Sequence, residues 1–147
     1  MSADRSVQLI QGTAVSIDGR GVLILGAPNS GKTSLALALI DRGAGLIGDD
    51  GVAISDEEGR VMASPPPNIT GMIEVRNIGI VQMPCNSAPL CLILELDKEA
   101  PRFIDEADSR ELAGQSIPMI KFKPGDAVQA IRAEMALAQY GLPKAGK

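Results

Sequence analysis

The stretch from Gly26 to Thr33, which reads G-A-P-N-S-G-K-T, constrains the fold of this chain more than any other. It matches the G-x-x-x-x-G-K-[ST] pattern of loops that bind phosphate groups. An apolar run suited to a buried strand (21–25) precedes it, and a run of good helix formers (33–42) follows it. Gly43 then stands where a helix C-terminal glycine is expected. This order predicts an α/β fold with a phosphate-binding loop (P-loop). The alternative is a glycine-rich turn that matches by chance.

Each residue type in this motif has a physical role in phosphate binding. Gly26 and Gly31 allow backbone angles and close approaches that a side chain would block. Lys32 carries a mobile positive charge for the β- and γ-phosphates, and the Thr33 hydroxyl can ligate Mg²⁺. Backbone amides of the loop and of the helix N-terminus can donate to phosphate oxygens. The predicted nucleotide-binding residues are Gly26, Ala27, Pro28, Asn29, Ser30, Gly31, Lys32, Thr33 and Ser34.

Two adjacent carboxylates, Asp49 and Asp50, follow a short apolar run (44–48). Ligands of open α/β sheets gather at the carboxyl ends of the strands. One helix and one strand separate Asp49 from the phosphate loop, which returns the chain to the same edge of the sheet. We therefore expect a metal-linked or general-base role for this pair. The alternative is an ordinary turn, which also favours aspartate.

The remaining segments predict a mixed sheet with flanking helices in a single domain, residues 1–147. Residues 1–5 are expected to be a frayed terminus. The helix that we expect at 126–140 has Val128, Ile131, Met135 and Leu137 at helical spacing. Before the phosphate-loop motif we expect strands at 7–10 and 13–17, and a turn that joins the second of these to the strand at 21–25. After the aspartates we expect a hairpin of 51–55 and 60–63 with a charged tip, a proline connector at 65–67 and a half-buried strand within 69–81. The last part of the chain is expected to contain a central strand at 89–96, a charged, irregular segment with a short helix at 98–112, and a last strand at 116–122.

Charge and composition exclude several classes of function. A net charge of -4 and a pI of about 4.8 argue against a nucleic-acid partner. No apolar stretch is long enough to span a bilayer, and no basic-then-apolar leader is visible, so no membrane partner is expected. Cys85 and Cys91 have neither a metal-type spacing nor a disulfide framework, which favours a cytoplasmic protein. The chain has no histidine, which excludes a histidine general base on this chain.

A second motif lies at residues 73–80, which read I-E-V-R-N-I-G-I. Together with 21–24, the phosphate-loop motif and the L-I-G-D-D of 46–50, it resembles the catalytic domain of the bacterial HPr kinase/phosphorylase family, whose signature is I-E-[VI]-R-G-[LI]-G-I. The chain length is similar to that of the short alphaproteobacterial form, which lacks a separate N-terminal domain. The resemblance covers roughly the first two-thirds of the chain.

The resemblance implies a fold related to phosphoenolpyruvate carboxykinase and an enzyme that uses ATP and Mg²⁺. It implies phosphorylation of a serine on an HPr-like phosphocarrier protein of the phosphotransferase system, which regulates carbon and nitrogen metabolism. Full-length members of the family are hexamers, so the resemblance leaves open whether this chain is a monomer or a homo-oligomer. The residues carried over by position are Asp49 as the general base, Asp50 beside it, Lys32 against the transferring phosphoryl group, Arg76 in the active site, and Thr33 and Glu74 as ligands of Mg²⁺.

The chain departs from the family pattern at three single positions and in one late segment. Gln11 and Ala44 stand where the family has histidines, and Asn77 stands where it has a glycine. The late P-G-R-N segment is P-G-D-A here (124–127). In the family, a histidine can tune the pKa of the carboxylate base, and this chain has none. We therefore expect a serine kinase whose reverse activity, phosphorolysis of phosphoserine, is weak or absent. Two alternatives remain: a nucleotide-binding regulatory module that has lost catalysis, and an unrelated phosphate-loop enzyme such as a small-molecule kinase.

Overall fold

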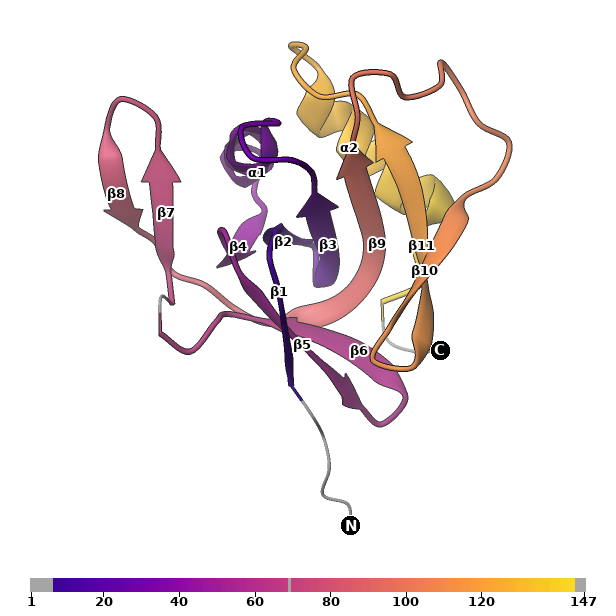
Figure 1. The fold of residues 1–147 in the computed structure, drawn as a ribbon, viewed down its shortest axis with the longest axis horizontal. Coiled ribbons are helices and arrows are strands. Elements are labelled where there is room, and N and C mark those ends of the chain that lie inside the picture. Colours follow the sequence, from indigo (N-terminus) through magenta and orange to yellow (C-terminus); the bar gives the residue numbers. More distant parts are fainter. Residues whose placement is uncertain (1–6, 69, 145–147) are drawn as a thin grey trace.

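The computed structural model describes residues 7–68 and 70–144. Within these residues the chain forms a nine-stranded sheet, a separate two-stranded sheet and two helices (Figure 1). Neither helix is long and apolar enough to cross a membrane. The predicted frayed terminus and Ile69, the first residue of one predicted strand, lie outside the described residues. The elements are β1 (Gln8–Ile10), β2 (Thr13–Ile17), β3 (Arg20–Leu25), α1 (Lys32–Asp41), β4 (Gly45–Gly48), β5 (Val52–Glu57), β6 (Arg60–Ser64), β7 (Met72–Val75), β8 (Gly79–Gln82), β9 (Ala88–Leu96), β10 (Asp108–Leu112), β11 (Gln115–Phe122) and α2 (Gln129–Tyr140).

The centre of the large sheet is built from β3 and β9, the two most apolar runs of the sequence. The strand order is β1-β5-β6-β9-β3-β2-β4, with the β10–β11 hairpin joined to β9 through β11. Val22 and Ile24 of β3 belong to one hydrophobic cluster, and Leu23 and Leu25 belong to a second cluster. Because both faces of β3 are covered, its sequence is continuously apolar and does not alternate. The prediction that 89–96 is a central strand is confirmed.

An extra residue near Cys91 curls the sheet. Gly21 lies opposite Leu90 and Val22 lies opposite Leu92, so β9 bulges relative to β3. A bulge bends its strand and increases the local twist. The bent β9 pairs with β6 at its start and with β11 at its end, and Figure 1 shows its curvature.

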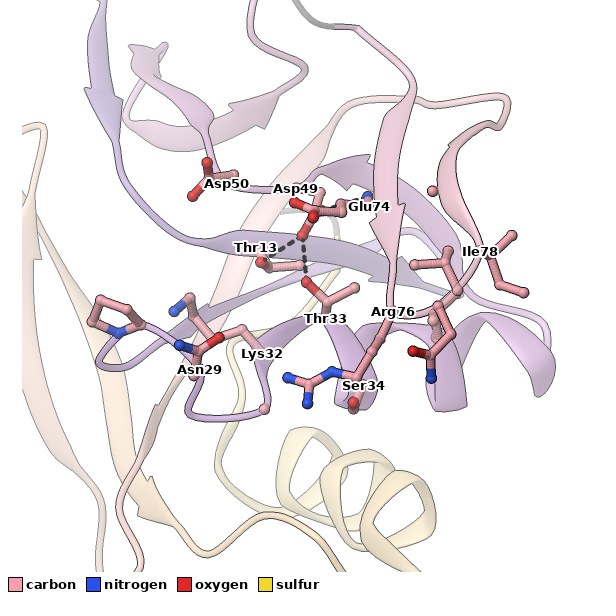
Figure 2. Close-up of a pocket in the computed structure, with 16 residues that line it drawn as sticks. Thr13, Asn29, Lys32, Thr33, Ser34, Asp49, Asp50, Glu74, Arg76 and Ile78 are labelled. Atoms are coloured by element: carbon pink, nitrogen blue, oxygen red, sulfur yellow. Dashed lines mark hydrogen bonds between the residues drawn. The ribbon is translucent and has the colours of Figure 1, made fainter.

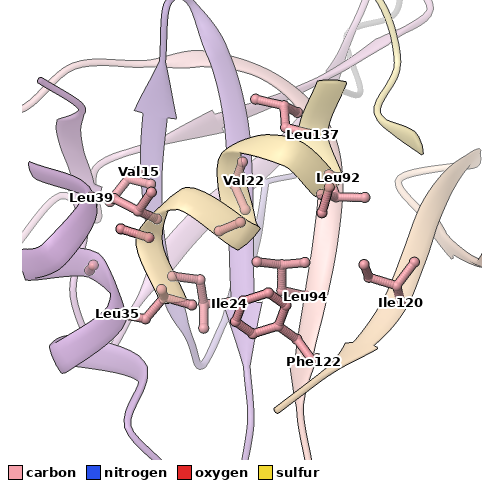
Figure 3. Packing of buried hydrophobic residues seen from close by; sticks show 14 of the residues in the cluster. Val15, Val22, Ile24, Leu35, Leu39, Leu92, Leu94, Ile120, Phe122 and Leu137 are labelled. Atoms are coloured by element: carbon pink, nitrogen blue, oxygen red, sulfur yellow. The ribbon is translucent and has the colours of Figure 1, made fainter. Parts of the chain in front are cut away.

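Both helices cover the same face of the sheet. Leu35 and Leu39 of α1 and Leu137 of α2 pack on β3 and β9 in the first cluster (Figure 3). Arg42, which follows α1, forms a bidentate ion pair with Glu134 of α2 at 2.9 and 3.0 Å. This contact raises the pKa of the Arg42 guanidinium, chiefly through the hydrogen bond to Glu134. The second cluster lies on the other face, beneath the curled strands β5, β6, β10 and β11.

Four strands end at one edge of the sheet. β3, β9 and β11 are parallel, and β4 runs the same way because β2 is antiparallel to both β3 and β4. The segments that follow these strands therefore gather at this edge, which lies at the top of Figure 1 for β3, β9 and β11. One helix and one strand do return the chain from the phosphate-loop motif to that edge, as the sequence predicted.

β7 and β8 form a hairpin that stands apart from the large sheet, beside α1 (Figure 1). We call residues 72–82 the arm. The Met83 amide donates to the Gly71 carbonyl at 2.8 Å and closes its base. The prediction of a single strand within 69–81 is wrong, because the chain reverses at Asn77, whose φ is 71°. The predicted alternation is correct: Ile73 is buried, Val75 is half-buried, and Glu74 and Arg76 are exposed.

Two further predictions need correction. Residues 98–112, all of which are described, contain no helix, and their end forms β10, which pairs with β11. The charged side chains of β10 suit an exposed edge strand, so its hydrophobicity gave no signal. Of the four apolar residues predicted for the second helix, only Leu137 is buried; Ile131 is half-buried, and Val128 and Met135 are exposed. The rest of the buried face of α2 consists of Ala130, Ala133 and Ala136. Small side chains let α2 lie close to the sheet.

The last residue of β4, directly before the two aspartates, must be glycine. A Cβ there would collide with the Gly51 carbonyl oxygen and lie 3.1 Å from Cδ of Pro66. We expect Gly48→Ala to lower the free energy of unfolding by about 3 kcal/mol, measured by urea denaturation. Gly51→Ala is the matched control, since its Cβ would make only an ordinary contact of 3.8 Å with Pro66. Equal stability of the two variants would contradict the requirement for glycine at position 48.

Candidate active site

A cleft of about 920 Å³ opens at the edge where β3 and β4 end (Figure 2). One side is the glycine-rich loop (residues 26–31) with the start of α1, and the other side is the arm. The two aspartates after β4 lie between them. The lining residues are Thr13, Pro28, Asn29, Gly31, Lys32, Thr33, Ser34, Leu37, Asp49, Asp50, Glu74, Val75, Arg76, Asn77, Ile78 and Gly79.

The glycine-rich loop presents the start of α1 to this cleft. The Ser30 amide donates to the Ala27 carbonyl at 3.1 Å, and Asn29 and Gly31 have φ values of 64° and 106°. Gly31 is the N-cap of α1 and makes no side-chain capping bond. The first amides of a helix have no partner within the helix. With no side-chain cap here, they can bind an anion such as a phosphate group.

Two cationic side chains border the same part of the cleft. The Lys32 ammonium donates to the carbonyl oxygens of Gly26 and Ala27, each at 3.0 Å. An ammonium has three hydrogens, so Lys32 can donate one more bond to a ligand. Arg76 follows β7, and its side chain extends toward Ser34 and the start of α1 in Figure 2. Both charges favour an anionic ligand.

Asp49 is the point where four elements meet. Its side chain is buried, with 8% of the residue exposed. Oδ1 accepts hydrogen bonds from the hydroxyls of Thr33 at 2.9 Å and Thr13 at 3.1 Å, and Oδ2 accepts one from the Glu74 amide at 3.2 Å. These contacts join the carboxylate after β4 to α1, β2 and the arm. Hydrogen bonds to an ionised acceptor are stronger than neutral ones, so the carboxylate stays in place.

Asp50 has a different environment from its neighbour. It is exposed, and its φ of 64° lies in the left-handed region, which aspartate tolerates better than most residues. Figure 2 shows its carboxylate apart from that of Asp49, on the side away from Glu74. The pair therefore consists of one buried, hydrogen-bonded carboxylate and one exposed carboxylate.

The oxygen donors of the cleft suit a magnesium ion that arrives with phosphates. In the described part of the chain, no three Asp, Glu or Cys side chains converge to hold a metal by themselves. Mg²⁺ is usually held by one or two protein ligands together with phosphate and water oxygens. Glu74 lines the cleft, and the Thr33 hydroxyl directs its hydrogen at Asp49, which leaves oxygen lone pairs for a cation. The donor set fits Mg²⁺ in the presence of a nucleotide.

The structure brings most of the predicted site residues into one cleft, including Lys32, Thr33, Glu74 and Arg76. Gly26, Ala27 and Ser30 belong to the loop but do not line the cleft. Six residues that line the cleft were not predicted as site residues from the sequence: Thr13, Leu37, Val75, Asn77, Ile78 and Gly79. A polar residue in an apolar strand was the available signal for Thr13, but its contact with Asp49 depends on the pairing of β2 with β4.

Two of the departures from the family pattern have a structural explanation. Asn77 adopts a left-handed φ of 71°, which glycine and asparagine both accommodate. Asp126 does not line the cleft; it accepts hydrogen bonds from the Val128 amide at 3.1 Å and from Arg132 at 3.3 Å. The segment 124–127 still lies close to the glycine-rich loop. A Cβ atom added at Gly31 would lie 3.7 Å from Cβ of Pro124.

Comparisons with known proteins agree on one family. Residues 4–86, more than half of the 147-residue chain, match the family model described as the HPr Serine kinase C-terminal domain. The HPr kinase/phosphorylase of Clostridium tetani is 43% identical over 75 residues, 51% of this chain and 25% of that protein. The HPr kinase/phosphorylase of Shouchella clausii is 31% identical over 156 aligned residues, 95% of this chain and 50% of that protein. This chain therefore spans half or less of the length of these relatives.

A solved structure extends the similarity to the fold. The Hpr(Ser) kinase/phosphatase from Coxiella burnetii superposes with a TM-score of 0.76 and 28% sequence identity. The superposition covers 90% of this chain and 93% of that chain. The similarity thus includes the curled sheet and both helices, and is not limited to the strands around the glycine-rich loop.

Proposed function

Since this chain belongs to the HPr serine kinase C-terminal domain family, we propose that it is an ATP-dependent kinase for a serine of an HPr-like phosphocarrier protein. The observation that carries the proposal is the 2.9 Å hydrogen bond between Thr33 and Asp49. It joins the first turn of α1, which follows the glycine-rich loop and where a nucleotide phosphate can bind, to a carboxylate that can accept a proton. A phosphoryl donor and an acceptor hydroxyl can therefore meet in one cleft.

Nucleotide binding is assigned to the glycine-rich loop and the start of α1. The uncapped amides of the first helical turn donate to the phosphate oxygens, and Lys32 neutralises charge on the transferring group. Arg76 stabilises the same charge from the arm. Thr33 and Glu74 would hold Mg²⁺, which when bound supplies positive charge to the β- and γ-phosphates. This division of work suits phosphoryl transfer, which depends mainly on positioning and electrostatic stabilisation.

Asp49 is assigned as the general base. A carboxylate has about four acceptor positions, and the three observed hydrogen bonds leave one on Oδ2. The serine oxygen forms a bond to the γ-phosphorus, the bond from that phosphorus to the bridging oxygen breaks, and ADP leaves. The serine proton passes to Asp49. Asp50 lies beside it and lines the same cleft.

The exposed apolar residues of the arm support a protein substrate over a small molecule. Ile78 and Ile80 are 72% and 65% exposed, and Ile78 lies at the cleft. Apolar side chains near an active site provide a contact surface for a partner protein.

The proposal has four further parts. We assign residues 1–147 to one cytoplasmic catalytic domain with a fold related to phosphoenolpyruvate carboxykinase. We also assign the protein a role in the phosphotransferase system, with weak phosphorolysis because the chain has no histidine.

The test is incubation with γ-labelled ATP, Mg²⁺ and the HPr-like protein of the same organism, followed by mapping of the phosphate. We expect label on one serine of the carrier and none on a carrier with that serine replaced by alanine. Tight ATP binding without label on the carrier would overturn the kinase proposal. That result would favour the nucleotide-binding regulatory module.

A further inference from the structure

We propose that Thr13 is a positioning residue for Asp49, and that its hydroxyl holds the carboxylate in the orientation used for proton transfer. The catalytic part of this inference rests on the proposed kinase function, whereas the positioning part concerns the fold alone. Thr13 would act through Asp49 and not on the substrate.

The burial of the Thr13 hydroxyl is the first observation. Thr13 begins β2, is 1% exposed, and donates to Asp49 Oδ1 at 3.1 Å. Burying a hydroxyl is unfavourable unless it forms a hydrogen bond. The pairing of β2 with β4 shifts between Ala14 and Val15, and Ala14 lies opposite Gly48. This register puts Thr13 next to the residue that follows β4, which is Asp49.

The second observation is that two hydroxyls share one carboxylate oxygen. Figure 2 shows Thr13 and Thr33 both bonded to Oδ1 of Asp49. These bonds orient the carboxylate so that Oδ2 accepts from the Glu74 amide of the arm at 3.2 Å. The bond from Thr13 does not involve the Thr33 hydroxyl, so it is independent of any cation that the Thr33 oxygen ligates. Thr13 thus keeps the Asp49 carboxylate, and with it the bond to the Glu74 amide of the arm, in the same position during nucleotide binding.

The experiment compares Thr13→Val, which keeps the shape but removes the hydroxyl, with Thr13→Ser, which keeps the hydroxyl. Thr13→Ala is a second hydroxyl-free variant that does not depend on the packing of valine. Ser16→Ala is the matched control, because Ser16 is a buried hydroxyl of the same strand that donates to Asn86 at 3.1 Å instead.

The first readout is amide hydrogen exchange in the protein without nucleotide. We expect Thr13→Val and Thr13→Ala to accelerate exchange of the Glu74 amide about 10-fold, as the loss of one hydrogen bond predicts. The Met83 amide, which bonds to the Gly71 carbonyl, should not change. Thr13→Ser and Ser16→Ala should match the wild type at both amides. An unchanged Glu74 amide in both hydroxyl-free variants would overturn the positioning role.

The second readout separates the proposal from the kinase assignment. In the carrier assay, kcat of Thr13→Val should fall about 10-fold with the KM for ATP within about 2-fold, and Thr13→Ser should recover most of the rate. Equal losses for valine and serine, or a rise in KM that matches the fall in kcat, would overturn the catalytic part. If the wild type labels no carrier but the Glu74 amide responds to Thr13→Val, the kinase assignment fails and the positioning role stands.

Discussion

Replacing Lys32 with alanine is expected to reduce phosphoryl transfer by about 10³-fold or more, while the protein still folds. The ammonium lies at the glycine-rich loop, where it donates to the carbonyl oxygens of Gly26 and Ala27 at 3.0 Å. Removing it takes away one of the positive charges that stabilise the transferring group in the transition state, and Arg76 on the arm cannot replace its contact with the loop. The two hydrogen bonds that it makes are exposed, so their loss should have little effect on stability.

The measurement is the initial rate of carrier phosphorylation at saturating ATP, together with the thermal unfolding midpoint. Lys98→Ala is the matched control, because Lys98 is exposed, follows β9 and does not line the cleft. It should keep the wild-type rate. A Lys32→Ala variant with undiminished turnover would refute the assignment of the glycine-rich loop to the phosphates.

Asp49→Asn is expected to lower kcat by about 10³-fold and to leave ATP binding nearly intact. The amide cannot accept the serine proton, although its oxygen can still accept bonds from Thr13 and Thr33. Its NH₂ group would then face the Glu74 amide, which now donates to Oδ2 at 3.2 Å. Two donors facing each other cost free energy, so we also expect a loss of about 1–2 kcal/mol in the free energy of unfolding.

Asp50→Asn is the matched control for the second prediction, because Asp50 is the exposed neighbour in the same cleft. We expect its rate to fall by less than about 10-fold. Calorimetry of ATP binding with Mg²⁺ separates the roles of Asp49. An equal loss of binding and transfer in Asp49→Asn would make it a metal-site residue, and a larger rate loss in Asp50→Asn would identify Asp50 as the base.

Features governed by local backbone preference and by burial were predictable from the sequence. The apolar runs of β3 and β9 indicated buried strands, and both lie at the centre of the sheet. Gly43 ends the first helix with a φ of 110°, as expected for a residue that needs the left-handed region. These signals lie within a few residues of the element that they specify, so they can be read without knowing the rest of the fold.

Features that depend on pairing or packing with another segment were not predictable in the same way. The charged strand β10 forms because β11 supplies its hydrogen-bond partners, and the arm forms because the chain reverses at Asn77. α2 packs on the sheet mainly through alanines, whose burial the hydrophobic pattern of the helix did not indicate. In each case the local sequence permits more than one structure, and packing against another segment selects one of them.

The candidate site shows the same division. The sequence by itself determined the glycine-rich loop, the helix that follows it and the pair of aspartates at the end of a strand, because each is a short stretch of characteristic residues. Only the tertiary structure decided that Asp49 accepts bonds from Thr13, which is 36 residues away, and from the Glu74 amide, 25 residues away. The physical reason is that strand register and the position of the arm set these distances, and both result from the folding of the whole chain.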